Sequence, residues 1–293
     1  MVRQVGRVAT APSLDGQFRS AVAALDAGDL AELDRLLTAH PRLVHDRLDA
    51  PGPWLREQVG DALDGFFRQP YLLWFVAEDP VRKGRLPANI AELARLIVGH
   101  AERARVSTLQ EQIDYALRLV AWSWIARECD VQLGLLDVLI DAGAAVDGRP
   151  EDALTNGNLA AAAHLVDRGA ALTLATALCL ERWDEAGPLT GAATVEEKQF
   201  ALVLVAVRGR ERAIAWLLDH GVDPDTTCPH LYSHATALHH AVSSGSLEAV
   251  RLLVEAGADV SAKDTAWQGT PLDWAEYGNR LEISAYLRGR PAM

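Results

Sequence analysis

The stretch TALHHAVSSGSLEAVRLLVEAGADV, residues 236–260, contains two short helical patterns separated by a turn. Apolar residues of its first half recur at helical spacing and stop at Gly245, and glycine favours the left-handed backbone that ends many helices. Apolar residues of the second half form the stripe Leu247, Val250, Leu253 and Val254, which stops at Gly257. The stretch therefore predicts a helical hairpin with one apolar face, which must stack on further copies to be buried.

Weaker copies of this hairpin recur along the chain. Thr270, Pro271 and Leu272 open a copy 34 positions after Thr236. Glycine pairs twelve positions apart bracket leucine-rich segments at Gly157 and Gly169, at Gly209 and Gly221, and at Gly245 and Gly257. This periodicity predicts an all-α solenoid of about seven to eight helix-turn-helix units, some with long insertions.

Three residues at the start of the opening stretch match a known repeat. Thr236, Leu238 and His239 fit the Thr-Pro-Leu-His opening of an ankyrin repeat, with Ala237 in place of the proline. The chain thus resembles the ankyrin-repeat family, and in particular bacterial-type ankyrin-repeat proteins. The resemblance implies a curved array of helix pairs whose concave face most often binds other proteins. It also implies that His239 forms a hydrogen bond to the neighbouring turn.

We expect one domain preceded by a flexible tail. The tail covers residues 1–16 and the solenoid residues 17–290. Within the solenoid we expect an N-terminal cap repeat at 17–46, divergent repeats with insertions at 47–147, short or degraded repeats at 148–197, regular repeats at 198–260 and a C-terminal cap repeat at 261–290. An extra helix is predicted at 58–67 and a loop at 187–197.

Composition excludes some classes of function. The net charge of −12 argues against general nucleic-acid binding, which needs a basic face. The three widely spaced cysteines indicate a reducing compartment, and no apolar run is long enough to span a membrane. We therefore expect a cytoplasmic protein with no nucleic-acid or membrane partner.

Partner binding is predicted at the loops that lead into the last two repeats. Tyr232 and Trp267 lie in these loops, and aromatic residues in loops are common interface anchors. The alternative for each is packing over a neighbouring turn. The candidate contact residues are Asp225, His230, Tyr232, His234, Ser243, Ser244, Thr265, Trp267 and Gln268.

A metal site is the alternative use of the same region. Thiolate and imidazole are preferred zinc ligands, and Cys228, His230 and His234 lie within seven positions. Their spacing matches no standard zinc module, so a mixture of structural and surface roles is favoured and no cofactor is expected.

Catalysis is not predicted, because the sequence lacks the phosphate-loop, dinucleotide, zinc-protease and hydrolase motifs. The competing hypothesis is a small-molecule or metal-dependent enzyme with a pocket beside the insertions around Trp54 and residues 79–89. In the second insertion, Asp79, Arg82, Lys83 and Arg85 could steer a charged ligand, although a mobile surface loop is the simpler interpretation. Self-association through the exposed array is a third hypothesis.

Overall fold

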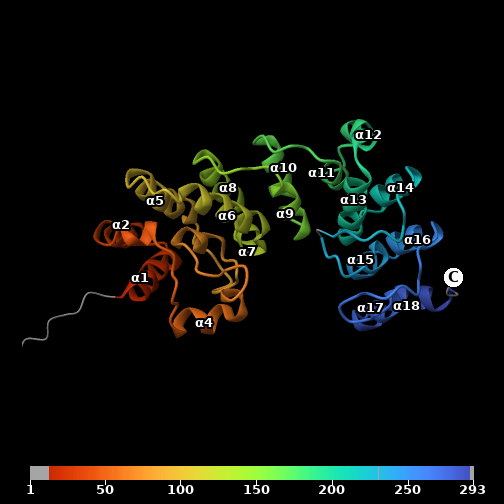
Figure 1. Ribbon diagram of the computed structural model, residues 1–293, viewed down its shortest axis with the longest axis horizontal. Helices are drawn as coiled ribbons and strands as arrows, with labels where there is room; N and C mark the ends of the chain where they lie inside the picture. Colours follow the sequence, from red (N-terminus) through yellow and green to blue (C-terminus); the bar gives the residue numbers. More distant parts are fainter. Residues whose placement is uncertain (1–12, 230, 291–293) are drawn as a thin grey trace, which may run out of the picture. The chain divides into compact units, whose positions relative to one another are not determined.

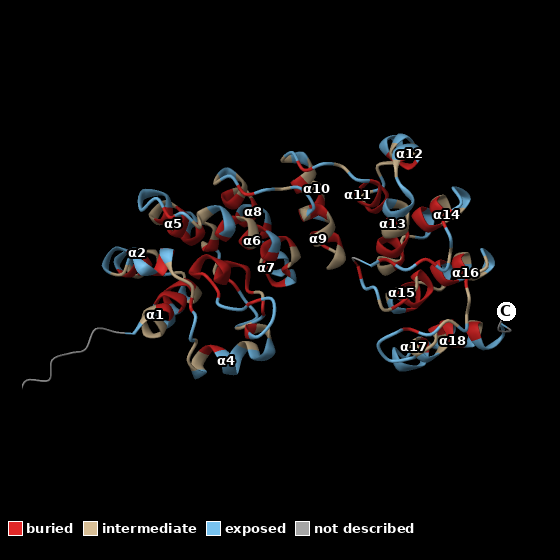
Figure 2. Cartoon of the chain, viewed as in Figure 1, coloured by how far each residue is buried: buried red, intermediate tan, exposed pale blue. Residues whose placement is uncertain are grey.

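The computed structural model describes residues 13–229 and 231–290, which form helices and turns without any β-strand. The chain divides into two compact units, Met1–Val146 and Asp147–Met293, here called unit 1 and unit 2 (Figure 1). In both units the buried residues gather where paired helices face each other (Figure 2). The all-helical fold predicted from the repeat pattern is confirmed for the described residues.

Unit 1 is built from helices that pack in sequence-local groups. Helix α1 packs on α2, the 3-10 helix η2 packs on α6, and α8 packs on both α5 and α6. The elements are α1 (Leu14–Ala27), α2 (Leu30–Ala39), α3 (Arg42–His45), α4 (Pro53–Val59), η1 (Gly60–Leu63), η2 (Leu72–Ala77), α5 (Ile90–Arg103), α6 (Leu109–Trp122), α7 (Trp124–Glu128) and α8 (Gln132–Asp141).

The start of unit 1 differs from the predicted tail. Ser13 caps α1 by accepting a hydrogen bond from the Gly16 N–H, so the helix begins at Leu14, inside the segment expected to be flexible. The rest of that segment, residues 1–12, lies outside the described residues.

The predicted helix at 58–67 is misplaced. Helix α4 begins earlier, at Pro53, because proline suits the first helical turn, and it ends at Gly60, whose φ is 53°. The short 3-10 helix η1 covers most of the remainder. The apolar run 72–77 also forms a 3-10 helix rather than an α-helix, and every one of its residues is buried.

The insertion after η2 is anchored by a buried cluster of charges. The Glu78 carboxylate accepts hydrogen bonds from the N–H groups of Arg82 at 3.0 Å and Lys83 at 2.6 Å. The Arg82 guanidinium donates to Asp26 of α1 at 3.1 Å and to the Phe75 carbonyl at 2.8 Å. Since the Arg82 side chain is only 1 % exposed, it is not available to steer a ligand. These contacts anchor the first part of the insertion to α1 and to the end of η2.

Asp79, next to this cluster, is expected to destabilise unit 1 at neutral pH. Burial, and then the negative charge of Glu78, raise the pKa of Asp79 from 3.8 to about 6. Folding therefore favours the protonated acid, and its contribution to stability is lost as the pH rises from about 4 through about 6. We expect Asp79→Asn to raise the free energy of unfolding by about 1–2 kcal/mol above pH 7, after allowance for partial solvent screening.

Urea unfolding of both proteins at a series of pH values, with hydrogen exchange to locate the effect in unit 1, would test this. The difference between Asp79→Asn and the unsubstituted chain should disappear below about pH 4. An equal difference at pH 4 and pH 8 would show that the ionisation of Asp79 is not its cause.

Unit 2 consists of helical hairpins that stack on one another. The hairpins are α9–α10, α11–α12, α13–α14, α15–α16 and α17–α18, and their first helices pack in the order α11, α13, α15, α17. The elements are α9 (Arg149–Thr155), α10 (Leu159–Asp167), α11 (Leu174–Cys179), α12 (Trp183–Ala192), α13 (Val195–Val207), α14 (Glu211–Asp219), α15 (Ala237–Ser244), α16 (Leu247–Glu255), α17 (Pro271–Tyr277) and α18 (Leu281–Arg288).

The loop predicted at 187–197 is wrong, because α12 continues through Gly187 and Pro188 to Ala192. Helix α13 follows at Val195 after a capping box, in which the Thr194 side chain and Glu197 satisfy each other's backbone N–H groups. Glycine and proline suggested a break, whereas the capping pattern Thr-x-x-Glu marks the actual start of the next helix.

A recurring hydrogen bond joins an aspartate to the backbone of a loop further along the chain. An aspartate in one repeat accepts the backbone N–H of a residue 24 to 34 positions further on. The pairs are Asp114 with Ala145, Asp147 with Ala171, and Asp225 with Asp259, at 2.7, 3.0 and 2.7 Å. Each bond satisfies a loop N–H that no helix would pair, and so it fixes that loop against the segment that carries the aspartate.

Candidate functional site

Most of the predicted contact residues lie on two loops of unit 2. Loop A, residues 220–236, joins α14 to α15, and loop B, residues 256–270, joins α16 to α17. Asp225, Tyr232 and His234 are on loop A, and Thr265, Trp267 and Gln268 are on loop B. His230 is also on loop A but lies outside the described residues.

Backbone groups hold the two loops side by side. The Asp259 N–H of loop B donates to the Asp225 carboxylate of loop A at 2.7 Å. Further along, the Thr265 N–H donates to the His234 carbonyl, also at 2.7 Å. The described parts of the two loops are therefore neighbours.

The conformation of loop B depends on the buried carboxylate of Asp264, which is 1 % exposed. It accepts hydrogen bonds from the N–H groups of Ala266, Trp267 and Gly269, at 2.9, 2.6 and 2.9 Å, and from Nε1–H of Trp274 at 2.9 Å. Burial raises the pKa of Asp264, but these hydrogen bonds together outweigh it and lower the pKa to about 2. Asp264 is therefore ionised at neutral pH, and its charge holds loop B in one shape.

Aromatic side chains from both loops and from α17 form an aromatic patch, which consists of Tyr232, His234, Trp267 and Trp274. The His234 ring lies edge to face with Trp267, at a centroid distance of 5.1 Å, and nearly parallel to Trp274 at 5.9 Å. Tyr232 packs against His240 at 5.4 Å. Trp267 is 72 % exposed and Tyr232 41 %, so the patch faces solvent although His234, Trp267 and Trp274 contact one another.

The two histidines of α15 below the patch are structural. His239 Nδ1 lies 3.3 Å from the Thr236 N–H, and His239 Nε2 lies 3.1 Å from the Gly269 carbonyl. The first nitrogen accepts and the second donates, which requires a neutral ring. The predicted bond from His239 to the neighbouring turn is thereby confirmed. Burial lowers the pKa of His239, and it lowers the pKa of His240 to about 4.

Ser243 and Ser244 lie apart from the aromatic patch, in the last turn of α15. The Ser243 carbonyl accepts a hydrogen bond from Arg280 at 2.9 Å, and the Ser244 hydroxyl donates to the Ala241 carbonyl at 2.7 Å. A helix of eight residues is about 12 Å long, so a partner on the aromatic patch would have to extend along α15 to reach them.

The predicted zinc ligands are only partly placed by the structure. Cys228 is 1 % exposed, and His234 is packed against the indoles of the patch. Within residues 13–229 and 231–290, no group of three or more His, Cys, Asp or Glu side chains is arranged to hold a metal ion. Because His230 lies outside these ranges, the zinc hypothesis remains an untested prediction.

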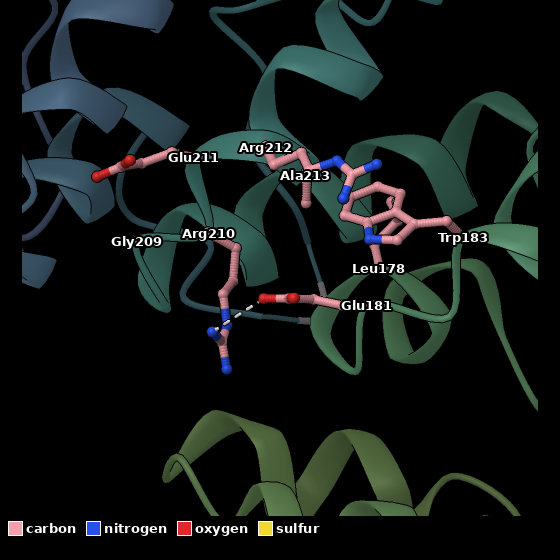
Figure 3. Close-up of a pocket in the computed structure, with 8 residues that line it drawn as sticks. All are labelled: Leu178, Glu181, Trp183, Gly209, Arg210, Glu211, Arg212 and Ala213. Atoms are coloured by element: carbon pink, nitrogen blue, oxygen red, sulfur yellow. Dashed lines mark ion pairs between the residues drawn. The ribbon is translucent and has the colours of Figure 1, made fainter.

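A shallow pocket lies between the turns α11–α12 and α13–α14 (Figure 3). The Arg210 guanidinium faces Glu181 across the pocket at 3.5 Å, and the Arg212 guanidinium lies over the Trp183 ring at 4.1 Å. Glu211 accepts a hydrogen bond from Ser246 of the next repeat. Since these charged groups already have partners within the chain, the pocket does not favour a ligand of either charge.

The insertions named for the enzyme hypothesis are anchored to α1. The Trp54 indole and the Gly52 N–H both donate to the Asp15 carboxylate, at 2.8 and 2.7 Å. Arg82 anchors the second insertion to Asp26. Both contacts give these residues a structural role.

Asp264 and Trp274 were not singled out from the sequence, yet they organise the site. The sequence feature that could have indicated this role is an aspartate, Asp264, five positions before Gly269. Gly269 directly precedes the Thr-Pro pair at the start of α17. The role of Asp264 depends on three N–H groups of loop B, which all point at its carboxylate in the folded chain.

Comparison with known proteins agrees with this architecture. A family profile for ankyrin repeats matches residues 151–264 and 202–290. The potassium channel SKOR of Arabidopsis thaliana is 41 % identical over 83 residues, which cover 28 % of this chain and 10 % of the channel. Cyclin-dependent kinase 4 inhibitor B of Homo sapiens is 31 % identical over 86 residues, 29 % of this chain and 60 % of the inhibitor.

A third relative is protein phosphatase 1 regulatory subunit 27 of Mus musculus, 46 % identical over 67 residues, which cover 22 % of this chain and 40 % of that subunit. The chain thus spans about a tenth of the channel and less than two thirds of the other two relatives. The family match falls on the stacked hairpins of unit 2. Residues 151–290 are therefore ankyrin repeats.

Proposed function

We propose that the protein is a binding module that contacts another protein through loops A and B and the aromatic patch. The main support is the state of Trp267, a large aromatic side chain that is 72 % exposed on a loop fixed by four hydrogen bonds to Asp264. An anchor that is already ordered loses little conformational entropy on binding. Exposed tryptophans on rigid supports are typical interface hot spots.

The relatives support a binding role by analogy. Two of them are, by name, an inhibitor of a kinase and a regulatory subunit of a phosphatase. Ankyrin repeats generally bind other proteins, and the partner of this chain is expected to be a protein as well. The three free cysteines fit a reducing, cytoplasmic location. None of the described helices has the length and apolar character needed to cross a bilayer.

Trp267→Ala is expected to weaken partner binding about 30-fold or more while leaving the fold intact, because the side chain is mostly exposed. A photo-crosslinking residue at Thr265, which is exposed beside Trp267, would trap the partner in the native cells. Mass spectrometry would identify the partner, and calorimetry would then measure its affinity for each variant.

Two controls distinguish specific binding at this surface from nonspecific hydrophobic association. Tyr277→Ala removes a more exposed aromatic ring from α17 and should leave the Thr265 crosslink unchanged. A crosslinker at Val195, 73 % exposed at the start of α13, should not trap the same partner. A Thr265 crosslink that persists in Trp267→Ala would contradict the proposal, and a crosslink to a second copy of this chain would identify self-association.

A further inference from the structure

The chain covers several of its aromatic rings with its own arginines. The Arg212 guanidinium lies 4.1 Å from the centre of the Trp183 ring, and Arg47 lies 4.4 Å from that of Tyr71. The same arrangement recurs with Arg82 over Phe75 and with Arg251 and Arg290 over Tyr286. A cation over an aromatic face is attracted by the electron-rich ring, most strongly when the ring is an indole.

Trp267 lacks such a cover within the described part of the chain. Its ring neighbours are His234 at 5.1 Å and Trp274 at 6.0 Å, both at steep interplanar angles of 86° and 63°. Edge-to-face neighbours leave most of the indole surface in contact with solvent, in agreement with its 72 % exposure. The most exposed tryptophan among the described residues is thus an indole without an intramolecular cation.

The charges around Trp267 favour a positively charged ligand. The ionised Asp264 carboxylate accepts hydrogen bonds from the Trp267 N–H and from the Trp274 indole, which places a negative charge directly below the patch. Neither histidine below the patch adds a positive charge, because His239 donates to a carbonyl from a neutral ring and burial lowers the pKa of His240 to about 4. Residues 147–293 as a whole contain 20 acidic and 12 basic side chains, a net charge of −8. Such a surface attracts basic segments and repels acidic ones.

We propose that the exposed face of Trp267 receives a lysine or arginine side chain from a basic segment of the partner protein. This inference rests on the proposed function and specifies the charge of the partner segment that binds. The cation lies over the indole as Arg212 lies over Trp183, while the stem of the side chain packs against His234. Loop B is already fixed by Asp264, so the ring is presented without rearrangement of the backbone.

A pair of synthetic peptides tests this with the full-length protein. One is a short Gly/Ser peptide with several lysines, and the other is the same peptide with every lysine acetylated, which keeps the stem but removes the charge. The indole Nε1–H resonance of Trp267, assigned by its absence in Trp267→Leu, reports binding at this ring. We expect the resonance to shift with the lysine peptide and to stay in place with the acetylated one.

Variants of the ring distinguish a cation–π contact from a plain apolar contact. Trp267→Leu keeps an apolar side chain but has no aromatic face, and it should weaken lysine-peptide binding about 5- to 30-fold. The affinity of Trp267→Phe for the lysine peptide should lie between those of the unsubstituted chain and Trp267→Leu, because a phenyl ring attracts cations less strongly than an indole. Tyr277→Ala is the matched control and should not change the affinity. Equal binding of the two peptides, or full retention of affinity in Trp267→Leu, would overturn the inference.

The outcomes also separate this inference from the proposed function. If the Thr265 crosslink depends on Trp267 but the acetylated peptide binds as well as the lysine peptide, the binding surface stands and the cation inference fails. If the crosslink is independent of Trp267, the surface itself is wrongly assigned. A Trp267-dependent crosslink together with selectivity for the lysine peptide supports both.

Discussion

Replacing Asp264 with alanine is expected to lower the free energy of unfolding of unit 2 by about 3–5 kcal/mol. The substitution leaves the N–H groups of Ala266, Trp267 and Gly269 and the indole of Trp274 without their shared acceptor. Hydrogen bonds to a charged group are stronger than neutral ones, and buried donors that lose their acceptor bear the full cost of desolvation. Loop B should consequently lose its fixed shape.

Urea unfolding would measure the loss, and hydrogen exchange at residues 266–269 would show whether it is centred on loop B. Asp259→Ala is the matched control on the same loop, because its carboxylate is exposed and accepts mainly from Ser261. It should cost less than about 1 kcal/mol. A loss of similar size in both variants would mean that Asp264 has no special role.

The pH dependence gives an independent check of the same contact. The pKa of Asp264 is lowered from 3.8 to about 2 in the folded protein. Its contribution to stability is therefore present above about pH 4 and lost as the pH falls through about 2. The difference in stability between Asp264→Ala and the unsubstituted chain should shrink over that range.

Arg82→Ala is expected to have a comparable effect in unit 1, with a loss of about 3–5 kcal/mol. The Arg82 side chain is 1 % exposed and lies between Asp26 and Glu78, with its guanidinium 3.1 and 3.7 Å from their carboxylates. It also covers the Phe75 ring at 5.1 Å. Removal leaves the buried Glu78 carboxylate without its positive partner, which is the costly way to break a buried ion pair.

Arg85→Ala provides the control for this prediction, because Arg85 is an exposed arginine of the same insertion. It should change the free energy of unfolding by less than about 0.5 kcal/mol. Thermal or urea unfolding would compare the two variants, with hydrogen exchange to assign the change to unit 1. If Arg82→Ala proved as stable as Arg85→Ala, the insertion would not depend on the buried charges.

The sequence predicts the parts of this fold that follow from local periodicity. The positive φ of Gly245 and Gly257, 84° and 100°, ends helices where the apolar stripes stop. The loop predicted at 187–197 was wrong because α12 continues through Pro188, although proline lacks the N–H that a helix interior uses. The 3-10 helix at 72–77 cannot be predicted from periodicity, since a fully buried apolar run has no amphipathic pattern.

Local sequence patterns likewise predict some residues of the candidate site but not the contacts that position them. Trp267 was identified as a contact residue because it is a large aromatic residue in a loop. The hydrogen bonds that hold the Trp267 loop to Asp264 could not be predicted, because they depend on the backbone conformation of residues 266–269. His239 was the exception, since its bond to Gly269 followed from the family resemblance.

The hydrogen bonds from these aspartates to later loops bear on how the chain folds during synthesis. The bonds from Asp114, Asp147 and Asp225 span only 31, 24 and 34 positions. The residue that donates each bond therefore leaves the ribosome shortly after the aspartate that accepts it. These three bonds can form before distant segments of the chain are synthesised. Low contact order of this sort favours rapid folding and limits the exposure of apolar faces in the nascent chain. The three carboxylates thus allow each new loop to dock on the segment that precedes it as the chain emerges.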